Sequence, residues 1–175
     1  VSAPLDQAML ARLAAVLDDA TTAFEGFDYA RALERAEGFF WWFCDDYVEL
    51  VKARAYGTQD EAGAQSARAA LRLALSAMTR AFAPFLPFVT DEVWRWWNTG
   101  SVHATAWPTS VDFPHGASAD ASASLDPVSE VLAQVRRAKT EAKVSQRAAV
   151  DTLVVYAPDA ARAAVDAALA DLRDA

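Results

Sequence analysis

The chain has 175 residues, of which 54% are hydrophobic and 23% are charged, and its formal net charge is −8. This composition suits one globular domain with a packed core, and no stretch approaches the roughly 20 apolar residues that a membrane span needs. The amino terminus lacks the order of a signal peptide, so we expect a cytoplasmic protein. One cysteine and two histidines exclude an internal disulfide framework and leave no cluster with metal-ligand spacing.

Apolar residues with helical spacing predict four helices in the first hundred residues, over residues 6–23, 28–56, 66–83 and 90–98. Gly57 follows the second helix, as glycine commonly does at a helix end. Residues 58–65 are expected to form a polar loop. Pro84 and Pro87 end the third helix because proline lacks the amide hydrogen that a helix interior requires. Thr90 is predicted to cap the fourth helix.

The residues after Gly100 predict a different organisation. Turn signals dominate up to residue 125, and residues 117–124 form a polar low-complexity run typical of a linker. Asp126 and Pro127 predict the start of a fifth helix. Residues 151–156 have the β-branched content of a short strand, and a last helix is expected from Pro158.

These elements predict a mainly α fold. We expect an antiparallel helix bundle over residues 1–110, a loop and linker over 111–125, and a small α+β appendage of helix, strand and helix over 126–175. A lone strand is not stable by itself. The chain also starts at Val1 rather than methionine and stops within a helical pattern. We therefore expect it to be a piece of a longer protein.

The most informative stretch is residues 39–56, FFWWFCDDYVELVKARAY. In a helix with about 100° per residue its apolar side chains share one arc. We expect this arc to face the core, and it consists of Leu50, Phe43, Tyr47, Phe40, Val51, Cys44, Val48 and Trp41. The opposite arc carries charged residues, with Trp42 in its middle. An exposed tryptophan among charges predicts contact with a partner.

Motifs for catalysis are absent from the sequence, which has no glycine-rich phosphate loop, G-x-S-x-G elbow or H-E-x-x-H pair. Cys44 lies on the apolar arc, so a buried, inert thiol is favoured over a nucleophile. Asp45, Asp46 and Glu49 could hold a cation or act as an acid and base pair. Pairing with nearby Arg and Lys on a solvated helix face is the favoured interpretation.

Basic residues are concentrated locally in this acidic chain. Residues 128–150 carry five basic and two acidic side chains, whereas residues 1–65 carry five basic and twelve acidic ones. Arg31 and Arg35 share the arc of Trp42, which is the combination of cations and an aromatic plane that holds single-stranded RNA. Residues 136, 139 and 143 form a basic stripe of the kind that phosphates favour. Pairing of these cations with neighbouring carboxylates is the alternative.

Three ordered segments resemble a known enzyme family. The 39–56 stretch resembles a helix in the anticodon-binding domain of valyl-tRNA synthetases. LSAMTRAFAPFLPFVTDEVW resembles the "APFxPFxTEEIW" signature shared by the valyl, isoleucyl and leucyl enzymes, and SVHATAWP resembles the segment that follows it. VRRAKTEAKVSQRAAVDTLVV is also similar to the continuation in the valyl and isoleucyl group. The resemblance covers nearly all of the chain and leans to the valyl enzymes.

The resemblance implies a non-catalytic piece of an ATP-dependent ligase that joins valine to its tRNA. The HIGH-like and KMSKS-like signatures of adenylate formation are absent here, so ATP with Mg belongs to the parent enzyme and the fragment itself is expected to use no cofactor or metal. The implied partners are the anticodon stem-loop of tRNA and the catalytic core of the parent, with no membrane. The implied work is positioning of the tRNA.

We assign hypothetical tRNA contacts on this basis. One group is expected to flank the anticodon loop and consists of Arg31, Arg35, Trp42, Lys52 and Arg54. A second group is expected to contact phosphates and consists of Arg136, Lys139 and Lys143. Trp42 has an alternative place in an interface with the catalytic core of the parent.

Three alternative functions stay open at this point. The acidic first 65 residues favour a helical protein-interaction module without an RNA role. The carboxylates of residues 45, 46 and 49 leave room for an enzyme, which requires a pocket and a strongly perturbed carboxylate pKa. The shared signature also fits the equivalent domain of an isoleucyl- or leucyl-type synthetase.

Overall fold

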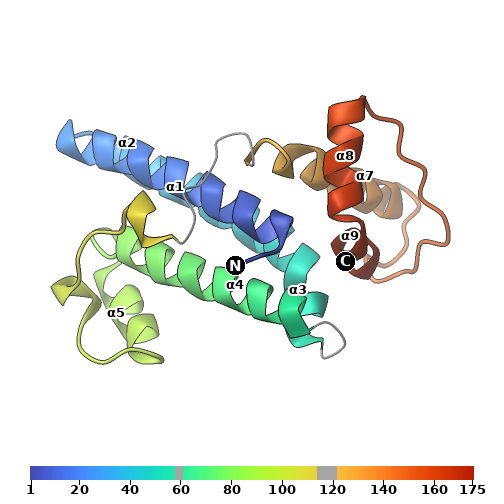
Figure 1. Cartoon of the computed structure of the whole chain (residues 1–175). Coiled ribbons are helices and arrows are strands. Elements are labelled where there is room, and N and C mark those ends of the chain that lie inside the picture. Colours follow the sequence, from blue (N-terminus) through green and yellow to red (C-terminus); the bar gives the residue numbers. More distant parts are fainter. Residues whose placement is uncertain (58–60, 114–121) are drawn as a thin grey trace.

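The computed structural model describes residues 1–57, 61–113 and 122–175, and all regular structure within these ranges is helical (Figure 1). The elements in chain order are α1 (Pro4–Glu25), α2 (Tyr29–Trp42), the π-helical turn η1 (Phe43–Tyr47), α3 (Val48–Tyr56), α4 (Glu61–Phe82), α5 (Pro87–Arg95), the 3-10 turns η2 (Val102–Ala104) and η3 (Ser110–Asp112), α7 (Leu125–Glu141), α8 (Asp159–Ala167) and α9 (Leu169–Asp174). The prediction of a mainly helical bundle is confirmed. Part of the predicted loop 58–65 and most of the predicted linker 117–124 lie outside the described residues.

The core lies between α1, α4 and the continuous rod formed by α2, η1 and α3 (Figure 1). Helix α4 turns alanine side chains inward at residues 67, 70, 74 and 77, and these are completely buried. Their three- and four-residue spacing puts them on one face of the helix. Large side chains from the facing helices fill the space that the alanines leave, namely Met9, Leu13, Leu17, Phe39, Phe43, Tyr47 and Leu50.

The rod from α2 to α3 contains one wider turn. At Val48 the backbone amide donates to the carbonyl of Phe43, five residues earlier, which defines the π-helical turn. The rings of Phe39, Phe43 and Tyr47 stack along the rod, with centroids 5.9 and 5.5 Å apart. The wider turn therefore lies directly in the aromatic line that faces the core.

The predicted core arc of this rod is partly wrong, because Trp41 is 56% exposed. The observed buried line starts with the small residues Ala32 and Ala36 and continues through Phe39 and Phe43. An arc drawn through the large apolar residues alone is rotated away from this line. Small side chains carry little hydrophobic signal in a sequence, although they define where helices approach each other most closely.

Two predicted helix starts are also corrected. Helix α4 begins at Glu61 rather than at Ser66, and Ser66 is buried within it. Helix α5 begins at Pro87, in a first turn where its missing amide hydrogen has no cost. Thr90 therefore lies inside the helix, where its hydroxyl donates to the carbonyl of Leu86 at 2.7 Å, and it does not cap the helix.

The C-terminal helices join the same core. Leu125, Val128 and Leu132 of α7 pack into the main hydrophobic cluster, α8 lies on α7, and α9 lies against α3. Within the described residues, the predicted strand at 151–156 is wrong because the segment has no regular structure and no strand pairs with it. A strand needs a hydrogen-bonded neighbour, and β-branched composition cannot supply one. The observed appendage is therefore helical rather than α+β.

A buried ionic network ties the C-terminal helix α9 to the bundle. The Arg54 guanidinium donates to both carboxylate oxygens of Asp6, at 2.9 and 2.8 Å, and to both of Asp171, at 2.8 and 3.0 Å. Tyr47 and Ser66 also donate to Asp6, at 2.8 and 2.6 Å. Burial and the adjacent Asp6 carboxylate raise the pKa of the Tyr47 hydroxyl, so it stays a neutral donor. Side chains from α1, η1, α3, α4 and α9 meet at this point.

The turn between α5 and η2 is closed by Asp91. Its carboxylate accepts hydrogen bonds from the Ser101 hydroxyl at 2.5 Å and from the Val102 amide at 3.1 Å, and it pairs with Arg95 at 2.7 Å. The Ser101 hydrogen bond is the largest of the effects that lower the pKa of the Asp91 carboxyl group, and the amide and Arg95 contribute in the same direction.

Replacement of the buried guanidinium tests the network. We expect Arg54→Ala to lower the free energy of unfolding by about 3–5 kcal/mol, because it leaves two carboxylates without their cation. Lys52→Ala is the matched control, since Lys52 forms a partly exposed ion pair with Glu49 in the same helix, and its loss costs less than about 1 kcal/mol. Urea denaturation measures both, and equal effects of the two substitutions would contradict the network.

Titration tests the Asp91 turn. We expect the carboxyl carbon of Asp91 to titrate in NMR spectra below the ordinary value of about 3.9, and Ser101→Ala to raise the midpoint. Because the folded-state pKa is lowered, the stability that these bonds contribute is complete above the ordinary value and is lost as the pH falls through the lowered one. An unchanged titration midpoint of Asp91 in Ser101→Ala would contradict the assigned role of the Ser101 hydrogen bond.

Candidate nucleic-acid interface

Trp42 does not lie on an exposed surface, so that prediction is wrong. Its indole nitrogen donates to the Ser129 hydroxyl of α7 at 2.9 Å, and the Arg12 guanidinium of α1 lies 4.5 Å from the centre of its ring. The Phe39 ring lies 5.6 Å away on the same helix. At Trp42, the arc expected to meet a partner is instead in contact with α1 and α7 of the same chain. A helical wheel cannot show this contact, since 87 residues separate Trp42 from Ser129.

The five residues expected around the anticodon loop are not brought together. Arg31 and Arg35 lie near the start of α2, whereas Lys52 and Arg54 lie near the end of α3, at the other end of the rod (Figure 1). At about 1.5 Å per residue, the helical path from Arg31 to Arg54 is roughly 35 Å. Arg54 is also held in the ionic network with only 14% of its side chain exposed, so its guanidinium group belongs to the interior of the fold and not to the cationic surface.

Arg31 and Arg35 are the exposed cations of α2. Within the described residues, neither guanidinium group forms a hydrogen bond or an ion pair, although the backbone amide of Arg31 is capped by the Asp28 carboxylate at 3.1 Å. Both side chains are therefore available to an external anion.

The basic stripe of α7 separates into a paired and an exposed part. Arg136 donates to the Asp46 carboxylate at 2.9 Å and to the carbonyl of Asp45, so it holds α7 against η1. For Arg136, the alternative prediction, that these cations pair with neighbouring carboxylates, is confirmed. The remaining cations surround the end of the helix and are called the basic turn here: Arg137, Lys139, Lys143 and Arg147.

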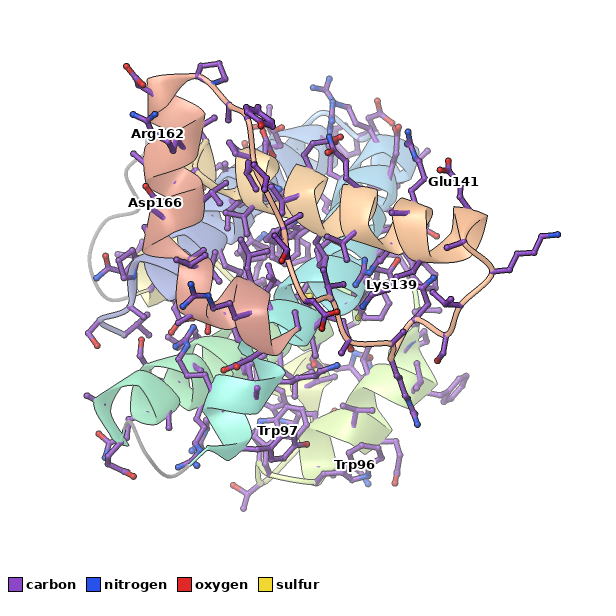
Figure 2. All side chains as sticks on the ribbon, turned by 90° about the vertical axis from the view of Figure 1, so that its right-hand side faces the viewer. Trp96, Trp97, Lys139, Glu141, Arg162 and Asp166 are labelled. Carbon is purple, nitrogen blue, oxygen red and sulfur yellow. The ribbon has the colours of Figure 1, made fainter. Side chains whose placement is uncertain are left out.

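The basic turn has a defined backbone. Residues after α7 fold back onto its last turn, because the Gln146 side chain donates to the carbonyl of Arg136 at 3.3 Å and Lys139 Nζ donates to the carbonyl of Gln146 at 2.9 Å. Lys143 reverses the chain with a φ of 55°, in the left-handed region that a non-glycine residue adopts uncommonly. Figure 2 shows Lys139 and Glu141 on different sides of this last helical turn. Four cations thus surround one turn that contains a single acidic side chain, Glu141.

Three of the four residues considered for catalysis, Cys44, Asp46 and Glu49, are occupied in packing or pairing. Asp46 pairs with Arg136, and Glu49 pairs with Lys52. Cys44 packs against the core, and burial together with the Asp45 carboxylate raises the pKa of its thiol. No group of His, Cys, Asp and Glu side chains among the described residues has the arrangement of a metal site. No helix in the described part of the chain has the length and apolar content to cross a membrane.

These features define a helical binding domain, in which a packed bundle presents exposed cations on one helix and on one turn. Residues 6–154 match the family described as the anticodon-binding domain of tRNA ligase. The chain therefore belongs to this family. The family resemblance seen in the sequence is confirmed, and most of α1, the whole rod, α4, α5 and the whole of α7 lie within the matched residues.

Similar proteins are valine–tRNA ligases. The one from Thermobifida fusca (strain YX) is 56% identical over 163 residues, which are 93% of this chain and 18% of that protein. The one from Leifsonia xyli subsp. xyli (strain CTCB07) is 51% identical over 173 residues, 99% of this chain and 20% of that protein. A relative from Bifidobacterium longum (strain DJO10A) is 43% identical and covers all of this chain. The chain spans about a fifth of the length of these relatives.

The contact between Trp42 and Ser129 is testable by a double-mutant cycle. We expect Trp42→Phe and Ser129→Ala each to lower the free energy of unfolding by about 1 kcal/mol, because each removes one partner of the same hydrogen bond. The double variant should cost less than the sum of the two. Urea denaturation measures all three. If the two losses of stability are strictly additive, the hydrogen bond between Trp42 and Ser129 does not stabilise the fold. If Trp42→Phe loses tRNA affinity without losing stability, the tryptophan contacts RNA instead.

Proposed function

We propose that this chain is the anticodon-binding region of a valine–tRNA ligase and that it binds the anticodon arm of valine tRNA. The observation that carries the proposal is the family match over residues 6–154, together with 51–56% identity to valine–tRNA ligases over nearly the whole chain. The observed bundle supports it, since the rod and its flanking helices form a rigid support for surface cations. The protein works in the cytoplasm, where tRNA is charged.

In this proposal the chain contributes position rather than chemistry. A tRNA held by its anticodon arm has its acceptor end near a distant catalytic domain, and such placement replaces a bimolecular encounter by an intramolecular one. The catalytic domain of the ligase supplies ATP and Mg binding, and the present residues need neither. The two proposed partners are therefore the tRNA and the catalytic core of the same ligase.

The electrostatic contacts have to be local, because the whole chain carries a net charge of −8. RNA phosphates are bound by exposed cations, and each neutralised phosphate releases counterions, so affinity falls as salt rises. The basic turn of α7 is the strongest candidate for these contacts, since Arg137, Lys143 and Arg147 are exposed there and Lys139 lies among them, partly exposed. Arg31 and Arg35 on α2 are a second, smaller group of exposed cations, with the exposed side chains of Asp28 and Glu34 beside them.

Salt dependence tests this assignment. We expect a full-length valine tRNA transcript to bind more weakly as salt rises, and Lys143→Ala to reduce the slope of log K against log salt by about one. Arg162→Ala is the matched control, since Arg162 lies on α8 and pairs with Asp159, away from the basic turn (Figure 2). Fluorescence anisotropy measures both slopes.

The outcomes test RNA binding, the phosphate contacts and the valine specificity separately. If the wild-type chain does not bind the transcript even at low salt, the RNA role fails and a protein-interaction module becomes the better account. If the wild type binds and Lys143→Ala has the slope of Arg162→Ala, the phosphates lie elsewhere on the surface. A matched isoleucine tRNA transcript tests the valine assignment, and equal affinity for the two transcripts would contradict it.

A further inference from the structure

The tip between α1 and α2 contains a strained aromatic residue. Phe27 has a φ of 60°, in the left-handed region where glycine is the usual residue and a bulky side chain is an outlier. The turn is held firmly, because the Asp28 amide donates to the carbonyl of Ala23 at 2.8 Å and the Phe27 amide donates to the carbonyl of Phe24 at 3.0 Å. These two bonds form the glycine-favouring helix end known as a Schellman motif.

Burial of the ring does not compensate for this backbone strain, since Phe27 is 77% exposed. Neighbouring Gly26, which would relieve such strain, lies one position earlier with an ordinary φ of −82°. Strained residues cluster at functional sites, because a site can retain a conformation that stability alone disfavours. An exposed phenylalanine in a glycine position therefore indicates a function for its ring.

Further aromatic rings connect Phe27 to the core. Phe27 lies edge to face with Tyr29, with ring centroids 6.4 Å apart, and Tyr29 lies 5.6 Å from Phe24. Phe24 contacts Phe85 at 5.5 Å and Trp107 at 5.0 Å, so it anchors the row to the turn after α4 and to the loop before η3. Tyr29 is itself 51% exposed. The tip thus presents two exposed rings on an anchored support.

We propose that Phe27 and Tyr29 form a platform on which an unpaired base of the bound RNA stacks. The inference rests on the proposed function, and it adds residues that neither the family match nor the basic surfaces identify. Bases of a single-stranded loop have free faces, and stacking on aromatic side chains is a main means of holding them. The fixed backbone of the tip supports such stacking because little conformational freedom is lost on binding.

The charges around the tip are mixed, since Glu25, Asp28 and Glu34 are exposed beside the two arginines. Arg31 and Arg35 follow Tyr29 on the first turns of α2, and among the described residues their guanidinium groups form no ion pair, so phosphates adjacent to a stacked base contact these two cations. The tip and the basic turn lie at opposite ends of the molecule (Figure 1). A tRNA that contacts both must therefore lie along the bundle.

Phe27→Gly separates stacking from stability. Glycine adopts a positive φ without strain, so the thermal midpoint of the variant should not fall. Its affinity for a full-length valine tRNA transcript should be about five- to a hundred-fold weaker, the range for loss of one stacked base. Transcripts with 2-aminopurine at single anticodon-loop positions should lose fluorescence on binding the wild type at one position at least, and keep it with Phe27→Gly. Phe27→Trp should retain both affinity and quenching.

Tyr156→Ala provides the control, since Tyr156 is 94% exposed and lies just before α8, outside both the tip and the basic turn. It should leave affinity and quenching unchanged. If the wild type does not bind the transcript, the proposed function itself fails. If the wild type binds and Phe27→Gly binds equally well with the same quenching, the stacking platform is overturned, and the tip becomes a surface for a protein partner.

Discussion

The guanidinium group of Arg54 lies between the carboxylates of Asp6 and Asp171, and the arrangement of the bundle depends on this contact. A buried charge is tolerated only when it is paired and hydrogen-bonded, so the helices that carry these three residues must meet at one point. Asp6 and Asp171 lie 48 and 117 positions from Arg54 in the chain. The same contact therefore closes the bundle and holds α9 against α3. Hydrophobic packing supplies the bulk of the stability, and this ionic contact connects α1, α3 and α9.

The rod formed by α2, η1 and α3 likewise combines hydrophobic packing with polar contacts. Phe39, Phe43 and Tyr47 provide the packing, and the π-helical turn keeps their rings in one line as the helix passes the network. Tyr47 belongs to both, since its ring stacks in the core and its hydroxyl donates to Asp6. Trp42 extends the line to α7 through Ser129, and Arg136 adds an ion pair with Asp46 beside it. Trp42 and Asp46, from the polar side of the rod, thus bind α7 to the bundle.

The surfaces proposed to contact RNA are consequently at the ends of the molecule. The basic turn follows the last residues of α7, and the strained tip joins α1 to α2. Both are short backbone reversals anchored on long helices, which gives precise placement to residues that remain in solvent. A binding domain built in this way keeps its rigid core separate from its contacts. On the proposed function, substitutions at the ends alter RNA recognition without affecting the fold.

Sequence alone determined the helical class, most helices and the family. Apolar periodicity is a local property of the chain, and so are Pro84, Gly57 and the 39–56 stretch that carries the resemblance. The tertiary structure decided what depends on distant residues. It covered Trp42 with α1 and α7, buried Arg54 between two carboxylates, and left residues 151–156 without a partner strand among the described residues. It also revealed Phe27, because a backbone angle has no signature in composition. Periodicity shows which residues share a face, whereas only three-dimensional packing decides what that face meets.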